Sequence, residues 1–278
     1  MNHTPRRSPW RRTAWAALTV GALLLGGSSL ASAEPQTHRG EIAKPTVVLV
    51  HGAWADASGF AGVATALQTA GYPVREFANP LRSLTADSGA LGAYLQQRTD
   101  GPVILVGHSY GGAVITDAAL SDPDVRALVY IDAFVPDEGE SVNDLLGRQD
   151  PVDPTQVFDV VANPGAPEGV VDLYLKDAVF PVVFANGLSR AKQTQLLASQ
   201  RPLATPALGE PSGEPGWKTL PSWYVMGTED HIISPELQRF MAQRAGAKIT
   251  SVSAGHLAMV ARPDVVTATI LQADRATR

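Results

Sequence analysis

Residues 102–120 constrain the fold of this chain more than any other stretch. They begin with a β-branched, apolar run, 103–106, which is typical of a strand buried on both faces of a parallel sheet. The sequence GHSYG follows at 107–111, and residues 113–120 have the pattern of a helix. The stretch therefore predicts a strand, a sharp turn with Ser109 at its apex, and a helix.

The G-x-S-x-G spacing of this turn has a steric reason. The turn places Ser109 in a strained backbone conformation, and Gly107 and Gly111 let the strand and the helix approach closely. The hydroxyl is then held clear of the backbone, where a base and a substrate carbonyl can reach it. A five-residue match alone occurs by chance, but the flanking strand and helix favour a catalytic serine over a serine in an incidental Gly-rich turn.

Strands and helices alternate on both sides of this stretch. Such alternation predicts a parallel sheet covered by helices on both faces, with ligands bound beyond the carboxyl ends of the strands. We expect Thr85 to cap one helix and Gly71 to end another. The further strands are expected at 46–50, 74–77, 125–131, 222–226 and 247–252, and the further helices at 58–70, 85–98, 235–245 and 263–273.

The regular alternation stops between residues 136 and 220. Prolines recur throughout this segment, among short patches with a helical pattern at 170–176 and 190–199. Because the segment keeps apolar groups, it is expected to form a helical cap or lid rather than a disordered loop. The catalytic domain would then consist of residues 46–135 and 221–278.

The amino-terminal residues have the features of an export signal. Four arginines precede an apolar segment that is too short to span a bilayer comfortably, and an A-x-A pattern ends at Ala33. We therefore expect a signal peptide over 1–33, cleavage near Ala33, and a linker over 34–45. The product would be periplasmic or extracellular. An uncleaved membrane anchor is the alternative, and the export route, general secretory or twin-arginine, stays open.

Charge and composition exclude several classes of partner. Cleavage after Ala33 would remove four of the 22 basic residues and none of the 27 acidic residues, which leaves an acidic chain without basic runs. Neither a nucleic acid nor an anionic membrane is therefore expected as a partner. The chain has no cysteine, and no metal-binding spacing or phosphate loop occurs in it, so we expect no metal and no cofactor. The oligomeric state is left open.

A serine nucleophile needs a base to take its proton and a third group to orient that base. His256 follows the last expected strand and is the predicted base, whereas His231 is interpreted as a loop histidine. Asp230 follows the preceding strand and is the predicted acid. Asp132, at the end of the strand after the nucleophile's helix, is its rival, and the carboxylate that does not serve as the acid would be structural.

Two backbone N–H groups are expected to stabilise the oxyanion, one after the nucleophile and one from the loop of the first strand. These are the amides of Tyr110 and Ala53. Trp54, Phe134 and Leu257 follow strand ends or the catalytic histidine, and they are candidates for the walls of a substrate pocket, with core packing as the alternative interpretation.

With these residues in place, the chain resembles the α/β-hydrolase superfamily. The resemblance is closer still to the branch that contains plant methyl esterases, hydroxynitrile lyases and bacterial esterases. It implies an α/β-hydrolase fold and a triad at Ser109, Asp230 and His256. The motifs that carry it are VLVHGAW (48–54), GHSYGG (107–112), AFVPDEG (133–139), WYVMGTEDHIISPELQRF (223–240) and GHLAMVARP (255–263).

Two positions depart from the lyases of this branch, which the resemblance associates with a threonine after the first-strand histidine and a lysine after the catalytic histidine. This chain has Gly52 and Leu257 there. The resemblance therefore implies a carboxylesterase-like serine hydrolase acting on a small-molecule ester. The expected export signal adds that the enzyme is exported. The alternatives are a lyase or cofactor-free haloperoxidase on the same fold, and a ligand-binding protein without turnover.

Overall fold

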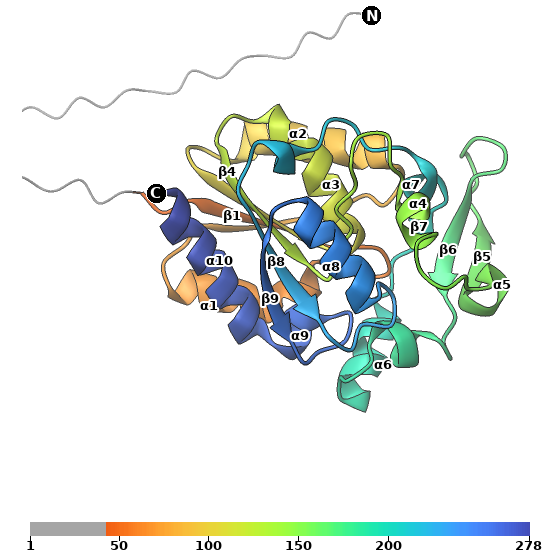
Figure 1. Cartoon of the computed structure of the whole chain (residues 1–278). Helices are drawn as coiled ribbons and strands as arrows, with labels where there is room; N and C mark the ends of the chain where they lie inside the picture. Colours follow the sequence, from red (N-terminus) through yellow and green to blue (C-terminus); the bar gives the residue numbers. More distant parts are fainter. Residues whose placement is uncertain (1–42) are drawn as a thin grey trace, which may run out of the picture. The chain divides into compact units, whose positions relative to one another are not determined.

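The computed structural model describes residues 43–278 of the chain (Figure 1). The predicted signal peptide, 1–33, and most of the predicted linker, 34–42, lie outside the described residues. The predicted export and cleavage therefore stay predictions.

A parallel sheet of six strands, in the order β2-β1-β3-β4-β8-β9, forms the centre of the structure. Every neighbouring pair in it is parallel, which confirms the expected architecture. The strands are β1 (Thr46–Val50), β2 (Val74–Phe77), β3 (Val103–His108), β4 (Val125–Ile131), β8 (Ser222–Gly227) and β9 (Lys248–Val252).

The register of the sheet gathers the strand-end loops at one edge. Val50 of β1 pairs with Gly107 of β3, Gly107 pairs with Tyr130 of β4, and Tyr130 pairs with Tyr224 of β8. Because these residues are level across the sheet and precede the strand ends by only a few positions, the loops after β1, β3, β4 and β8 meet beyond the carboxyl edge.

Helices cover both faces of this sheet. The helices α1 (Ala61–Thr69) and α10 (Pro263–Thr277) pack against each other on one face, and α2 (Leu84–Arg98) and α3 (Tyr110–Ala118) pack together on the other (Figure 1). The helix α8 (Pro235–Arg244) contacts β8 and β9. Short helical segments are η1 (Ala57–Phe60), η2 (Ala119–Ser121), η4 (Gly216–Lys218) and α9 (Ala258–Ala261).

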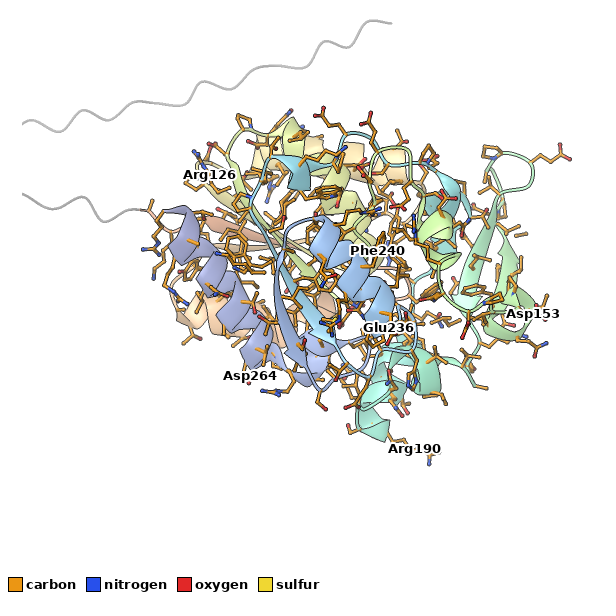
Figure 2. All side chains as sticks on the ribbon, in the orientation of Figure 1. Arg126, Asp153, Arg190, Glu236, Phe240 and Asp264 are labelled. Carbon is orange, nitrogen blue, oxygen red and sulfur yellow. The ribbon has the colours of Figure 1, made fainter. Side chains whose placement is uncertain are left out.

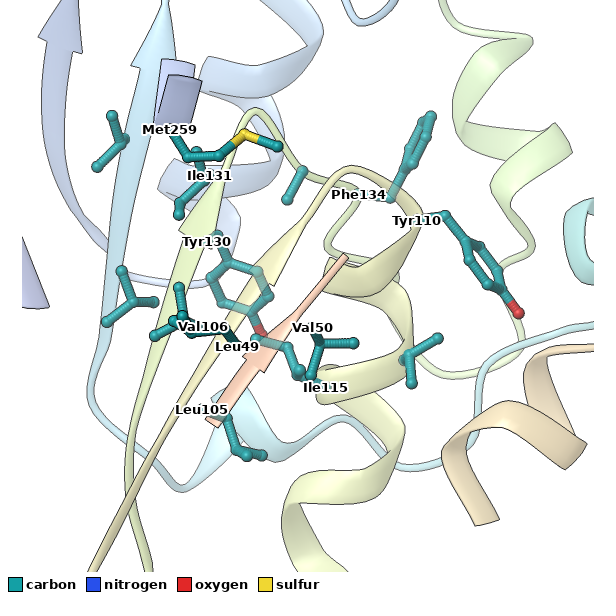
Figure 3. Close-up of a cluster of buried hydrophobic side chains, with 14 of the residues drawn as sticks. Leu49, Val50, Leu105, Val106, Tyr110, Ile115, Tyr130, Ile131, Phe134 and Met259 are labelled. Atoms are coloured by element: carbon teal, nitrogen blue, oxygen red, sulfur yellow. The ribbon is translucent and has the colours of Figure 1, made fainter. Parts of the chain in front are cut away.

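Strands with helices on both faces bury almost all of their side chains. Every residue of β1, β3 and β8 is buried, in agreement with their continuous apolar sequences. Figure 3 shows part of this core, with Leu105 and Val106 from β3, Tyr130 and Ile131 from β4, and Ile115 from the covering helix.

Most of the charged side chains of the described residues are exposed or half-buried, with a few buried aspartates as the exceptions. Arg126, Glu236 and Asp264 are exposed, and Figure 2 shows them on the outer surface of β4, α8 and α10. Among the helices of residues 43–278, none combines the length and the apolar character that crossing a bilayer requires.

The capping residue of α2 differs from the prediction. The helix begins at Leu84, and the side chain of Ser83, not that of Thr85, accepts the N-terminal hydrogen bond, from the N–H of Ala86 at 3.2 Å. The prediction was wrong because Ser83 has the extended backbone, φ −161° and ψ 155°, that an N-cap requires. The end of α1 agrees with the prediction, since Gly71 follows it with φ +78°.

The segment 136–220 contains a small sheet as well as helices. The antiparallel strands β5 (Phe158–Ala162), β6 (Val171–Leu175) and β7 (Leu203–Ala204) pair in the order β5-β6-β7. The interpretation of 170–176 as helical was therefore wrong, because its backbone pairs with β5, whereas a helix at 190–199 is confirmed as α6 (Arg190–Ala198). The remaining elements are α4 (Val142–Leu146), α5 (Pro154–Val157), η3 (Phe180–Phe184) and α7 (Pro206–Gly209).

This segment, which we call the cap, is attached near the end of β2 to the residues that carry the six-stranded sheet. The guanidinium of Arg82 lies 2.9 Å from the carboxylate of Asp172 in β6 and also donates to the carbonyl of Pro202. The N–H of Ala204 donates to the carbonyl of Leu81 at 3.0 Å. One side of the cap is thus held by both an ion pair and a backbone hydrogen bond.

The cap of α2 gives a stability prediction. We expect Ser83→Ala to lower the free energy of unfolding by about 1 kcal/mol, because the N–H of Ala86 loses its acceptor. Thr85→Ala is the matched control and should change it by less than about 0.5 kcal/mol, as is usual at exposed sites. Urea unfolding measures both; a larger loss for the Thr85 variant would contradict the assignment of the cap.

Candidate active site

Ser109 occupies the turn between β3 and α3 in a conformation that few residues adopt. Its φ is 53° and its ψ is −125°, in the region that is strained for a residue with a side chain. Its N–H donates to the carbonyl of Ile131 at 3.2 Å, and its carbonyl accepts from the N–H groups of Gly112 at 2.9 Å and Phe134 at 3.1 Å. The neighbouring backbone therefore holds the strained turn in place.

Glycines make this turn possible by allowing backbones to touch. A Cβ at Gly107 would lie 2.6 Å from the carbonyl oxygen of Gly111, and a Cβ at Gly112 would lie 2.5 Å from that of Phe134. Real Cβ atoms do not approach an oxygen so closely, so any other residue would push the strand, the helix or the following loop away from Ser109.

His256 lies between Ser109 and Asp230. Its Nε2 is 2.9 Å from the hydroxyl oxygen of Ser109, and its Nδ1 is 2.8 Å from Oδ2 of Asp230. The three side chains come from the loops after β3, β8 and β9, and all three residues are buried. A hydroxyl, an imidazole and a carboxylate joined in this order can pass a proton from the hydroxyl to the ring.

The carboxylate of Asp230 is held by four donors. Its Oδ1 accepts from the N–H groups of Ile232 at 2.7 Å and Ile233 at 3.1 Å, and its Oδ2 accepts from Nε2 of Gln238 at 2.7 Å as well as from His256. This arrangement fixes which oxygen faces the imidazole. Gln238 was not predicted, because its position on α8 shows no motif that would link it to Asp230.

Asp132 does not contact His256 in this structure. Its two oxygens accept from the N–H of Gly227 at 2.6 Å and from that of Ala258 at 3.0 Å. Burial, together with the nearby charge of Asp230, raises the pKa of Asp132 well above its usual value. Of the two acids left open by the sequence, Asp230 is therefore the partner of the imidazole, and Asp132 ties the loop of Asp230 to that of His256.

Neither His108 nor His231 makes a hydrogen bond with the hydroxyl of Ser109. Nε2 of His108 is 2.9 Å from the carbonyl oxygen of His256, and burial lowers the pKa of His108 well below its usual value. His231 is exposed, with its Nδ1 3.3 Å from the carbonyl oxygen of Val182.

Of the two amides predicted to hold an oxyanion, that of Tyr110 directly follows Ser109, and that of Ala53 follows Gly52, which packs against Ser109. Tyr110 is the first residue of α3, so its N–H has no acceptor within the helix. Gly52 lets the loop after β1, which contains Ala53, pack directly against Ser109. A Cβ at Gly52 would be 2.6 Å from Cβ of Ser109. The side chain of Tyr110 points away, and its hydroxyl donates to Asp87 at 2.8 Å. The contact at Gly52 also leaves no space for the threonine associated with the lyases.

The candidate pocket residues fall into two groups. Trp54 and Leu257 line a small, mostly apolar cavity together with Phe184, Leu196 and Met259, whereas Phe134 does not line it. Phe134 is buried in the core, as Figure 3 shows, and contributes its backbone N–H to the turn of Ser109. Leu257 puts an apolar side chain beside His256, where the lyases are associated with lysine.

The cap closes over this site. The ring of Phe184 at the end of η3 is 5.2 Å from the ring of His256, centroid to centroid, and Nδ2 of Asn186 donates to the carbonyl of Glu229 at 2.7 Å. Trp54 donates from its indole N–H to the carbonyl of Leu173 in β6. As a result Ser109 is only 2% exposed. These cap contacts were not predicted, because they join segments far apart in a sequence without a recognisable pattern.

Within the described part of the chain, no three His, Cys, Asp or Glu residues are grouped so that they could hold a metal ion.

Comparison with known proteins gives a family match over residues 47–269, to the model described as "Alpha/beta hydrolase family". A carbendazim hydrolyzing esterase of Nocardioides sp. is 37% identical over 124 residues, which cover 40% of this chain and 51% of that protein. Methylesterase 8 of Arabidopsis thaliana is 26% identical over 81% of this chain and 88% of its own length.

The chain thus spans about half the length of the first of these relatives. Among solved structures, polyneuridine aldehyde esterase superposes with a TM-score of 0.71 at 21% identity, over 82% of this chain and 98% of that one. At this level of identity the superposition supports the fold.

The two buried carboxylates give a test of the site. We expect Asp230→Asn to slow the reaction of Ser109 with a fluorophosphonate by about 10⁴-fold, because the imidazole loses its orienting charge. Asp132→Asn should slow it far less and should mainly lower the melting temperature, because an amide nitrogen would face a backbone N–H. Labelling rates of folded protein are compared; a greater loss of rate in the Asp132 variant would reverse the assignment.

Proposed function

The chain belongs to the alpha/beta hydrolase family, and from this membership we propose that it is a serine esterase that cleaves carboxylic esters through an acyl-enzyme. The observation that carries the proposal is the chain of hydrogen bonds from Ser109 through His256 to Asp230, at 2.9 and 2.8 Å. Two relatives, the carbendazim hydrolyzing esterase and methylesterase 8, are named as esterases, which agrees with the proposal.

In the proposed acylation step, Oγ of Ser109 attacks the ester carbonyl carbon while Nε2 of His256 accepts the hydroxyl proton. Asp230 stabilises the imidazolium that forms and keeps Nδ1 protonated. The negative oxygen of the tetrahedral intermediate accepts hydrogen bonds from the amides of Ala53 and Tyr110, and each such donor is typically worth about 10²–10³ in turnover. His256 then protonates the leaving alcohol.

Deacylation repeats these roles with water as the nucleophile. His256 takes a proton from the water as the water attacks the acyl carbon, and the imidazolium returns a proton to Ser109 as the acyl group leaves. The acid is released and the hydroxyl of Ser109 is restored. No metal or cofactor is part of the proposed cycle.

The substrate is proposed to be a small or medium ester with apolar groups. The support for this size and polarity is that Ser109 is buried under the cap and that the apolar side chains of Phe184 and Leu257 lie next to the imidazole of His256. An open groove for a polymer would require Ser109 to be accessible from solvent along the surface.

The proposed nucleophile gives a direct test. We expect Ser109→Ala to reduce the hydrolysis of p-nitrophenyl butyrate by about 10⁶-fold, as is usual when a triad serine is removed, with an unchanged melting temperature. Ser88→Ala, a serine on α2, is the control and should retain full activity. Hydrolysis by the Ser109 variant at the wild-type rate would exclude the mechanism.

Export is proposed from residues 1–33, with their basic start, apolar segment and A-x-A pattern. We expect the full chain, expressed in a bacterium with a periplasm, to be recovered outside the cytoplasm with Glu34 as its first residue. Amino-terminal sequencing of the recovered protein measures this, and Ala33→Trp should block cleavage. An unprocessed cytoplasmic product of the wild-type sequence would contradict it.

A further inference from the structure

Asn186 extends from the cap to the place where two catalytic loops meet. It follows η3, and its Nδ2 donates to the carbonyl of Glu229 at 2.7 Å. That carbonyl belongs to the peptide group that links Glu229 to Asp230, so its position is tied to that of the backbone nitrogen of Asp230. The mechanism above does not use Asn186.

The same amide packs against the loop of His256. A Cβ at Gly255 would lie 2.5 Å from Cγ and 2.6 Å from Nδ2 of Asn186, and closer still to its Oδ1. These are the three heavy atoms nearest to such a Cβ, so it is the side chain of Asn186 that excludes a larger residue here. The backbone does not require glycine, because Gly255 is not among the glycines with a positive φ.

The orientation of the amide indicates a role other than filling space. The carbonyl oxygen of Glu229 can only accept, so Nδ2 faces it and Oδ1 faces Gly255. There Oδ1 of Asn186 is buried, and no group of residues 43–278 donates to it. An unpaired buried oxygen lowers stability, so an apolar side chain would suit this position better if packing were its only role.

Asn186 covers a junction between the loops of Asp230 and His256. The N–H of Glu229 donates to the carbonyl of Ala254 at 3.0 Å, just beyond the last paired residues of β8 and β9. The hydrogen bond of 2.8 Å between His256 and Asp230 joins the same two loops. A group that fixes this junction therefore helps to fix the distance between the imidazole and the carboxylate.

A second contact holds the loop of Asp230 from its other side. Nδ1 of His231 lies 3.3 Å from the carbonyl oxygen of Val182 in η3. This oxygen can only accept, so the ring of His231 donates to it. The segment around η3 thus binds both chain neighbours of Asp230, which are Glu229 and His231.

The segment that carries Asn186 is tied to α6. Nε2 of Gln193 donates to the carbonyls of Pro181 and Ala185, both at 3.0 Å. Because Asn186 directly follows Ala185, it leaves the catalytic loops whenever this part of the cap moves away from them.

We propose that Asn186 is a positioning residue, which braces the loops of Asp230 and His256 so that the triad is aligned when the cap is closed. The proposal rests on the proposed esterase function, because the triad of that function is what Asn186 braces. A brace differs from a simple latch in the sign of its effect. Loss of a latch only eases the entry of the ester, whereas loss of a brace slows the bond-making steps.

Substitutions of Asn186 separate these two roles. Asn186→Ala removes the donor and the packing against Gly255, and Asn186→Asp keeps the shape but puts a carboxylate oxygen against the carbonyl of Glu229. Release of p-nitrophenol from p-nitrophenyl butyrate is measured in single turnovers with excess enzyme. We expect each variant to lower the saturating rate constant by about 10-fold, less than the about 10²-fold that a misplacement of about 1 Å can cost. The half-saturating enzyme concentration should not rise.

Gly255→Ala tests the same contact from the other loop. Its Cβ displaces the amide of Asn186, so we expect a similar fall in rate. In the double variant with Asn186→Ala, the Cβ occupies the space that the amide has left, so the double variant should react as fast as Asn186→Ala alone. Gln195→Ala, at an exposed residue of α6, is the control and should match the wild type.

The outcomes distinguish this inference from the proposed function. A wild-type protein that neither hydrolyses esters nor reacts with a fluorophosphonate would refute the function itself. If the wild type is active, the brace is refuted when folded Asn186→Ala reacts at the wild-type rate or faster, or when the losses of the two single variants multiply in the double variant. Thermal unfolding establishes that each variant is folded, and Asn186→Asp decides the question if Asn186→Ala is not.

Discussion

The position of every group at the site depends on the strained turn at Ser109. A residue with a side chain holds a φ of 53° only where its surroundings over-determine the conformation. Here the N–H of Ser109 is bound to the end of β4, and its carbonyl is bound by Gly112 and Phe134. The turn is therefore part of the sheet's own hydrogen bonding, and the buried core supplies the free energy that keeps it strained.

A second constraint is the presence of two carboxylates in the same buried region. Asp230 satisfies its oxygens with four donors, and Asp132 satisfies its oxygens with two backbone amides. Burying a carboxylate without such partners would cost several kcal/mol, on the order of the cost of any unpaired buried charge. These contacts give the two carboxylates different roles. Asp230 faces the imidazole of His256, whereas Asp132 joins the end of β8 to the loop after β9.

Much of this arrangement could be predicted from the sequence because it depends on local patterns. Each triad residue follows a predicted strand: Ser109, Asp230 and His256 come after β3, β8 and β9. Parallel strands of one sheet end at the same edge, so the three residues were expected to meet there. The choice between Asp132 and Asp230 could not be made in this way, since either follows a strand and only the backbone conformation decides which one reaches the ring. Asp132 itself has a φ of 43°, which no pattern indicates.

The cap could be predicted only as an insertion. Its strands pair residues that are 9 to 17 positions apart in β5 and β6 and 30 to 32 positions apart in β6 and β7. Residues 171–175, within the segment predicted to be helical, pair with β5 instead. Non-local pairing of this kind overrides local propensity. The contacts of Phe184 and Asn186 with the loops of His256 and Asp230 have the same origin.

The closed cap has a consequence for the timing of the reaction. Arg82 and Leu81 hold one side of the cap, while on the other side Phe184 lies against the ring of His256 and Asn186 binds the carbonyl of Glu229. In the proposed esterase, an ester would reach the buried Ser109 only when the contacts of Phe184 and Asn186 open. Each catalytic cycle then contains two passages through an open state. Such passages take microseconds to milliseconds and can be slower than the bond-making steps. If opening is the slower step, the release of the acid and the alcohol from beneath Phe184 limits the turnover rate of the proposed esterase.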